Sequence, residues 1–258
     1  ATSGRTTLNG EGLQHQDGHS HVLSSTIPNC LSYDPAFAYE VAVIIKDGIK
    51  KMYVDQENYF YYITTTNENY EHPEMIEGSE EAIIKGMHKI EGSKIPAVRL
   101  IGSGAILRES IKAKAILQNY NIDSEVWSVT SFNLLRKDGM EIERFNQLNP
   151  NLDEKLSYVE QCFDTKSIPV IASTDYMRSY AEQIRPYINS SYAVLGTDGF
   201  GRSDSREMLR GFFEINANNI VRASAYSLFK EGVIDKVQLD KIYLDMGVDP
   251  SKPNPWEA

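Results

Sequence analysis

The feature that most constrains the fold is a repeated alternation of short apolar runs with helical patterns in the second half of the chain. Two successive rounds of strand, helix and strand are predicted, at residues 96–101, 106–120 and 125–129, and then at 168–172, 176–184 and 192–195. Strands that are joined through helices form a largely parallel sheet with helices on its faces. The chain is therefore predicted to be an α/β protein.

Helical periodicity also marks the segments on either side of this alternation. Apolar residues recur every three or four positions from 36 to 52, which predicts an amphipathic helix. The aromatic and β-branched run at 59–65 predicts a buried strand, because it is too apolar for a sheet edge. Further helices are predicted from Ser79 to about residue 90, and at 205–213, 220–230 and 237–245.

Residues 67–78 separate the first part of the chain from the strand-helix alternation. Asn67, Asn69, His72, Pro73 and Gly78 give this stretch turn composition, and it has little periodicity. It is the best candidate for a domain boundary.

Charge and composition exclude several classes of partner. The 36 acidic and 26 basic residues give a net charge of -10, which repels nucleic acid and anionic membrane surfaces. No run of about 18 apolar residues could span a bilayer. Cys30 and Cys162 form no framework of disulfides, so a reducing cytoplasm is expected. Because the sequence opens in a polar loop without Met or a secretory signal, we expect a fragment or a processed chain.

Candidate chemistry is concentrated in the polar loop of residues 9–21. Three of the five histidines, His15, His19 and His21, lie in it among several glycines. Imidazole side chains donate and accept protons near neutral pH, so the cluster favours proton transfer or polarisation of a carbonyl group. Two alternatives stay open: some rings could merely satisfy buried backbone groups, or His15, Asp17, His19 and His21 could bind a metal ion.

Two glycine-rich turns, at residues 102–104 and 199–201, are weaker candidates for a phosphate site. Leu107 stands where a dinucleotide fingerprint has its third glycine, and no Gly-Lys-Ser or Gly-Lys-Thr of a P-loop occurs. Both turns are interpreted as tight connections from a strand to a helix.

Five segments carry a resemblance to a known family. In chain order they are NGEGLQHQDGHSH from Asn9, ITTTNENY from Ile63, SVTSF from Ser128, ASTDYM from Ala172 and LGTDGFGRSDSRE from Leu195. They resemble the homodimeric, bacterial-type pyruvate dehydrogenase component, a thiamine-diphosphate enzyme that decarboxylates pyruvate. The resemblance covers nearly the whole chain.

This resemblance implies a domain organisation and an activity. Residues 1–77 would complete a pyrimidine-binding domain, and residues 78–258 would form a transketolase-type C-terminal domain with a mainly parallel sheet. With thiamine diphosphate and magnesium, the family enzyme oxidatively decarboxylates pyruvate and transfers the acetyl group to the lipoyl group of dihydrolipoyl acetyltransferase. A cytoplasmic homodimer is implied as well.

The resemblance also ranks the residues of the loop. The residue that matches His15 faces the reactive carbon of the cofactor in this family, and His21 matches a histidine that contacts substrate in transketolases. His19 is included because of its proximity. Gln16 departs from the family pattern, which has glutamate there, and removes a negative charge beside His15.

Parts of the family's site are not in this sequence. The Gly-Asp-Gly motif for magnesium and diphosphate does not occur, and the glutamate that activates the aminopyrimidine lies upstream of Ala1 in the family's order. The cofactor contacts are therefore expected upstream of Ala1, no metal ligand is predicted, and the isolated chain is expected to be inactive. The alternative is a structural or docking module without catalysis of its own.

Overall fold

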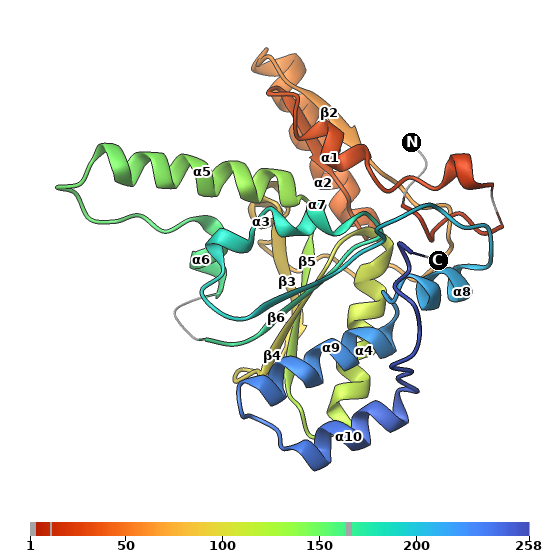
Figure 1. Ribbon diagram of the computed structural model, residues 1–258. Coiled ribbons are helices and arrows are strands. Elements are labelled where there is room, and N and C mark those ends of the chain that lie inside the picture. Colours follow the sequence, from red (N-terminus) through yellow and green to blue (C-terminus); the bar gives the residue numbers. More distant parts are fainter. Residues whose placement is uncertain (1–3, 11, 164–166, 258) are drawn as a thin grey trace.

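The computed structural model describes residues 4–10, 12–163 and 167–257, and Figure 1 shows their arrangement. Its larger sheet has five strands in the order β3-β5-β4-β6-β7. These strands are β3 (Met87–Gly92), β4 (Val98–Gly102), β5 (Ser124–Val129), β6 (Val170–Ser173) and β7 (Tyr192–Leu195). Only β3 runs antiparallel to its neighbour, so the predicted parallel α/β sheet is confirmed.

Helices cover both faces of this sheet (Figure 1). One face carries α4 (Leu107–Gln118), α9 (Ala217–Lys230) and α10 (Lys236–Asp245), and the other carries α5 (Phe132–Leu148), α6 (Tyr158–Phe163) and α7 (Arg178–Glu182). Successive side chains of a strand point to opposite faces. Leu100 of β4 accordingly packs in the first core and Ile101 in the second. None of the helices described is both long and apolar enough to cross a bilayer.

A second, smaller sheet contains two parallel strands, β1 (Cys30–Tyr33) and β2 (Phe60–Ile63). They are connected through α2 (Ala38–Ile49), which continues into one π-helical turn at Lys50–Val54. After β2 the chain runs through residues 64–79 without helix or strand and enters α3 (Glu80–Lys85). We call residues 64–79 the crossing segment. The other short helices are η1 (Leu13–His15), α1 (Ser20–Ser24), η3 (Gly104–Ile106), η4 (Arg185–Tyr187) and α8 (Arg206–Phe212).

The predicted helix from Ser79 to about residue 90 is wrong in its second half. Gly86 ends α3 with a φ of 117°, a left-handed conformation that glycine adopts readily. Residues beyond it form β3, so His88 lies on a strand rather than on a helix. A Cβ at position 86 would also lie 2.7 Å from the Ser131 carbonyl oxygen, so only glycine fits at this turn.

Two further elements differ from the sequence prediction. Strand β2 is not fully buried: Phe60 is 41% exposed, the next three residues are half-buried, and the Tyr61 hydroxyl donates to Asp47 Oδ2 at 2.8 Å. An aromatic strand can stand at an edge in this way because a phenol has a polar end. Helix α5, with 17 residues, lies in a stretch for which the sequence predicts no element.

Candidate functional site

The segment that precedes the predicted polar loop is fixed to the end of β6. Asp175 accepts hydrogen bonds from the hydroxyls of Thr6 and Thr7, each at 2.6 Å, and from the Thr6 backbone N–H at 3.1 Å. Burial raises the pKa of Asp175, although the two threonine hydroxyls oppose that shift. Gly4 has a φ of 71°, and a Cβ there would lie 2.0 Å from Asp175 Oδ2. Only glycine therefore allows this approach of the backbone to the carboxylate.

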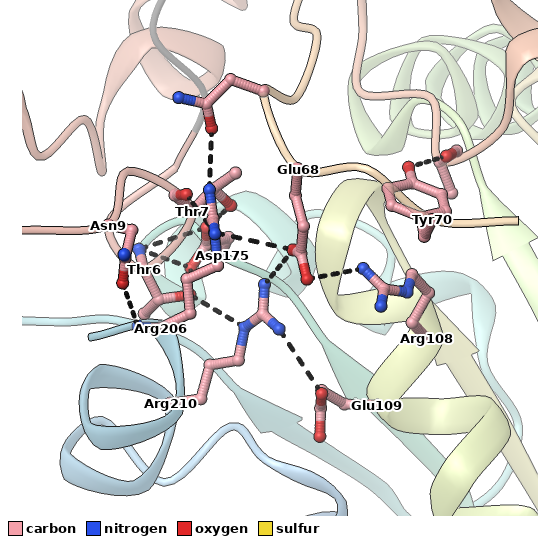
Figure 2. A network of polar contacts seen from close by, with 12 residues as sticks. Thr6, Thr7, Asn9, Glu68, Tyr70, Arg108, Glu109, Asp175, Arg206 and Arg210 are labelled. Atoms are coloured by element: carbon pink, nitrogen blue, oxygen red, sulfur yellow. Dashed lines mark hydrogen bonds and ion pairs between the residues drawn. The ribbon is translucent and has the colours of Figure 1, made fainter.

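A network of ion pairs joins this segment to the crossing segment and to α8 (Figure 2). Glu68 lies at its centre, 2.9 Å from Arg108, 3.1 Å from Arg210 and 3.8 Å from Arg206. Burial opposes the ionisation of Glu68, but the hydrogen bond from Arg108 and the charge of Arg210 outweigh it and lower the pKa. Arg206 also donates to the Thr7 carbonyl oxygen at 2.7 Å. The Glu68 carboxylate thus joins the crossing segment to α4 and α8, and Arg206 extends the network to Thr7.

The loop of residues 9–21, which we call the histidine loop, is described except for residue 11. Its two ends rest on the large sheet's connections: the Gly10 N–H donates to the Asp204 carbonyl oxygen at 3.0 Å, and the Met177 N–H donates to that of Gly18 at 3.1 Å. Gly18 packs against Arg5, since a Cβ there would lie 2.0 Å from Arg5 Nε. The backbone of the loop is therefore positioned by the elements beneath it.

The three predicted histidines have different surroundings. His15 ends η1 with an exposed side chain. His19 precedes α1, is also exposed, and accepts a hydrogen bond from Arg5 Nη2 at 3.2 Å through Nε2. His21 lies in α1 and is fully buried. The first two rings can meet a bound molecule, whereas the third is enclosed by protein.

His21 contributes to a cluster of aromatic rings. It stacks on Tyr180 with 4.8 Å between ring centroids, and it makes edge contacts with Tyr176 at 4.6 Å and Tyr62 at 5.4 Å. Its Nε2 lies 3.1 Å from the Thr64 hydroxyl oxygen. Burial lowers the pKa of His21 to about 3, against a smaller opposing effect of Asp17. The ring is therefore neutral throughout the physiological pH range.

The metal-binding alternative is not supported by the geometry. Asp17 uses Oδ1 to accept the backbone N–H groups of His19 and Ser20, both at 3.0 Å, and Oδ2 to accept the Ser20 hydroxyl. It acts as a cap for the short helix α1. Within the described ranges, no three His, Cys, Asp or Glu side chains are grouped so that they could hold a metal ion.

Sequence reasoning missed a buried carboxyl group near His21. Asp34 directly follows β1, and its two oxygens accept the hydroxyls of Thr64 at 2.6 Å and Ser103 at 2.8 Å. Burial raises the pKa of Asp34 to about 7, and these hydroxyls oppose the shift. Asp34, Thr64 and Ser103 each come immediately after a strand, at β1, β2 and β4. Polar residues at the carboxyl ends of parallel strands are a recognisable signal for function, and that signal could have identified them.

Two family models match the sequence. The model of the pyruvate dehydrogenase E1 component middle domain matches residues 1–73, and that of the transketolase-like C-terminal domain matches residues 86–216. The second match covers more than half of the chain. In chain order, the two matches fall on the small sheet and then on the large sheet.

Whole-chain relatives agree with these models. A pyruvate dehydrogenase E1 component from Pseudomonas aeruginosa is 54% identical over 262 residues, which cover 100% of this chain and 30% of the relative. That from Escherichia coli K12 is 54% identical over 260 residues, which cover 98% of this chain and 29% of the relative. The chain thus spans about 30% of the length of these relatives.

Solved structures show the same fold at low sequence identity. A transketolase complex from Pichia stipitis has a TM-score of 0.66 and 16% identity, covering 91% of this chain and 30% of the other. A transketolase from Leishmania mexicana has a TM-score of 0.62 and 15% identity, covering 89% of this chain and 30% of the other. The chain belongs to the pyruvate dehydrogenase E1 family, with middle-domain sequence followed by a transketolase-like C-terminal domain.

Proposed function

We propose that this chain forms one wall of a thiamine-diphosphate-dependent site that oxidatively decarboxylates pyruvate. The acetyl group is then transferred to the lipoyl group of dihydrolipoyl acetyltransferase. The observation that carries the proposal is the histidine loop, which presents the exposed rings of His15 and His19 on a backbone hydrogen-bonded to the segments that follow β6 and β7. Catalytic groups work best when a rigid scaffold fixes them in place.

Each histidine of the loop has its own proposed role. His15 exchanges protons with the reacting substrate, because its exposed ring can both donate and accept. His19 contacts the substrate next to Arg5, whose cationic group favours a carboxylate. His21 is fully buried and neutral, so we infer that it supports the loop and acts through its neighbours rather than by direct contact with substrate.

Anchoring of the cofactor is not assigned to this chain. Its described residues contain no group suited to a divalent ion, and the sequence has no Gly-Asp-Gly motif. Magnesium and diphosphate therefore do not fit the residues present here. We propose that they are held by other parts of the enzyme, which fits the 30% coverage of the relatives.

We also propose the domain boundary between residues 77 and 78. It falls at the end of the crossing segment, and it lies between the two matched ranges, 1–73 and 86–216. The assembled enzyme is proposed to be a homodimer in the cytoplasm, as the family resemblance implies.

A chimera tests the proposed activity. The matching stretch of the Pseudomonas aeruginosa E1 component is replaced by this chain, and pyruvate-dependent reduction of a lipoyl domain is measured. We expect an active chimera, and we expect His15→Ala to lower its rate by about 100-fold or more, the usual effect of a lost acid-base group. His72→Ala serves as the control, because His72 is an exposed histidine outside the loop. An unchanged rate for His15→Ala contradicts the assignment.

A second candidate function is a structural or docking module without catalysis. The observation that favours it is the lack of a metal-holding group in the described part of this chain. The isolated chain is assayed alone and after mixing with the remaining part of the relative. Activity only after mixing supports a shared site, whereas binding of the lipoyl domain without any activity in either sample supports the docking module.

A further inference from the structure

A chain of hydrogen-bonded side chains connects His21 with the ends of four strands. His21 Nε2 lies 3.1 Å from Thr64 Oγ1, and Thr64 donates to Asp34 Oδ1 at 2.6 Å. On the other side, Ser103 donates to Asp34 Oδ2 at 2.8 Å and lies 3.0 Å from the Thr174 hydroxyl. These groups follow β1, β2, β4 and β6, so the chain joins the carboxyl ends of the small and the large sheet.

The number of available protons determines the direction of these hydrogen bonds. A threonine hydroxyl has one proton, and an ionised carboxylate can only accept. The Thr64 proton therefore points to Asp34 Oδ1, which is nearer than the Tyr33 carbonyl oxygen at 3.3 Å. The remaining short contact, to His21, is satisfied only if Nε2 carries the proton and donates it to Thr64.

We propose that Asp34 and Thr64 are positioning residues that fix the neutral His21 ring in the tautomer with its proton on Nε2. This proposal rests on the proposed function of the histidine loop, which it extends to residues outside that loop. Nδ1 then keeps a bare lone pair, and among the described residues it has no hydrogen-bond partner. It lies within the ring cluster of Tyr62, Tyr176 and Tyr180.

The surroundings of Asp34 hold its carboxyl group in place. Its backbone N–H donates to the Thr130 carbonyl oxygen at 2.7 Å, so the residue is held from β5 as well. Gly104 has a φ of 49°, and a Cβ there would lie 2.5 Å from both carboxylate oxygens, so only glycine lets the backbone come this close to Asp34. The charged groups that face Asp34 are Asp175 and Glu40, and both act against its ionisation.

The tautomer matters for the loop because His21 is at its end. The Asn133 side chain donates to the His21 carbonyl oxygen at 2.8 Å, while Thr64 holds the ring. Backbone and side chain of His21 are thus both fixed, two residues after the exposed His19. A ring with its proton on Nδ1 would lose the donor to Thr64, and the start of α1 would be held only through its backbone.

The test is nitrogen-15 NMR of the complete 258-residue chain with labelled histidine. The two ring nitrogens of a neutral histidine differ in chemical shift according to which one carries the proton, and the His21 signals are assigned by their loss in His21→Gln. At a pH above 7, where Asp34 is ionised, we expect the Nε2–H form. A wild-type ring with its proton on Nδ1 overturns the proposal, whatever the variants show.

Three substitutions separate positioning from a general effect on structure. Thr64→Val removes the acceptor and should yield a mixture of tautomers, while Thr64→Ser should restore the wild-type spectrum. Asp34→Asn supplies an amide donor to Thr64, which frees the Thr64 proton for His21 and should increase the Nδ1–H population. An unchanged His21 spectrum in Thr64→Val contradicts the proposal.

Ser103→Ala is the matched control, because it removes the other donor to Asp34 and leaves Thr64 in place. It should retain the Nε2–H form. The measurement requires no cofactor or substrate, so it can succeed even if the chimera described above is inactive. Conversely, an active chimera with an unexpected tautomer leaves the proposed function intact and rejects only this inference.

Discussion

The Arg210 guanidinium lies 3.1 Å from the Glu68 carboxylate and joins helix α8 to the crossing segment. Arg210 also lies 3.5 Å from Glu109 and 3.4 Å from the Thr6 hydroxyl oxygen, which it reaches as a hydrogen-bond donor. Both side chains of the pair are largely buried. This ion pair is therefore one of several contacts in the network that set the relative positions of segments distant in sequence.

Glu68→Gln is expected to lower the free energy of unfolding by about 2 kcal/mol, since it removes the carboxylate that pairs with Arg108, Arg206 and Arg210. The pKa of Glu68 is lowered in the folded state. The stability that the ionised Glu68 contributes is therefore fully present above the ordinary glutamate pKa, and it is lost as the pH falls through the lowered pKa of the folded state. Urea unfolding at neutral and acidic pH measures both effects. Glu74→Gln, an exposed change in the same segment, should have little effect; equal losses for the two variants would refute the role of Glu68.

Gly18→Ala is expected to destabilise the chain by about 1–3 kcal/mol, the usual cost of overpacking. The added Cβ would lie 2.0 Å from Arg5 Nε, so Arg5 must move away from His19. Thermal unfolding measures the loss. Gly211→Ala is the control, because its nearest new contact is at 3.8 Å. If Gly18→Ala is as stable as this control, the packing of Gly18 against Arg5 is incorrect.

Asp34→Asn is expected to flatten the dependence of stability on pH. The pKa of Asp34 is raised by burial to about 7, so the folded state binds a proton that the unfolded state has released. The contribution of the protonated Asp34 to the free energy of unfolding is complete below the ordinary aspartate pKa, and it is lost as the pH rises to about 7. Unfolding in urea across this range should show a steeper fall for wild type than for Asp34→Asn. Asp123→Asn, at an exposed position, should follow the wild type.

His21 is expected not to titrate in the folded chain between pH 5 and 8, because burial lowers its pKa to about 3. Its ring should stay uncharged over this range, which the shifts of both ring nitrogens report, and it should titrate after unfolding in guanidinium chloride. The His21 ring is protonated more readily in the unfolded state than in the folded state. The free energy of unfolding therefore decreases as the pH falls below the ordinary histidine pKa. A folded-state transition to the charged imidazolium near neutrality would disprove the burial of the ring.

The alternation of strands and helices predicted the large sheet because short apolar runs mark β4, β6 and β7 and helical patterns separate them. Strand β3 was not predicted from the sequence. Helix α3 ends at Gly86 in a left-handed conformation, and the pattern of apolar residues does not reveal this end. Helix α5 was missed although Ser131 caps it by accepting the Leu134 N–H at 3.1 Å. Its polar, exposed outer positions weaken the pattern of apolar residues.

The histidine loop was recognisable from residue types alone, but the separation of its rings was not. Spacing cannot tell that His19 faces solvent while His21, two residues later, is enclosed by three tyrosines. That difference depends on residues more than 40 positions away, Thr64 and Tyr180 among them. Contacts between distant segments also explain why sequence reasoning missed Asp34, whose partners Thr64 and Ser103 follow other strands.

The small sheet has a consequence for work with the separate chain. Strand β1 is buried and pairs with β2 on one side, whereas β2 is partly exposed and pairs with no other strand among the described residues, so its outer edge is open. Such open edges, here next to the exposed Phe60, are templates for pairing with another molecule. We therefore expect self-association through this ribbon, rather than unfolding of the five-stranded sheet, to limit the concentration at which the protein can be stored.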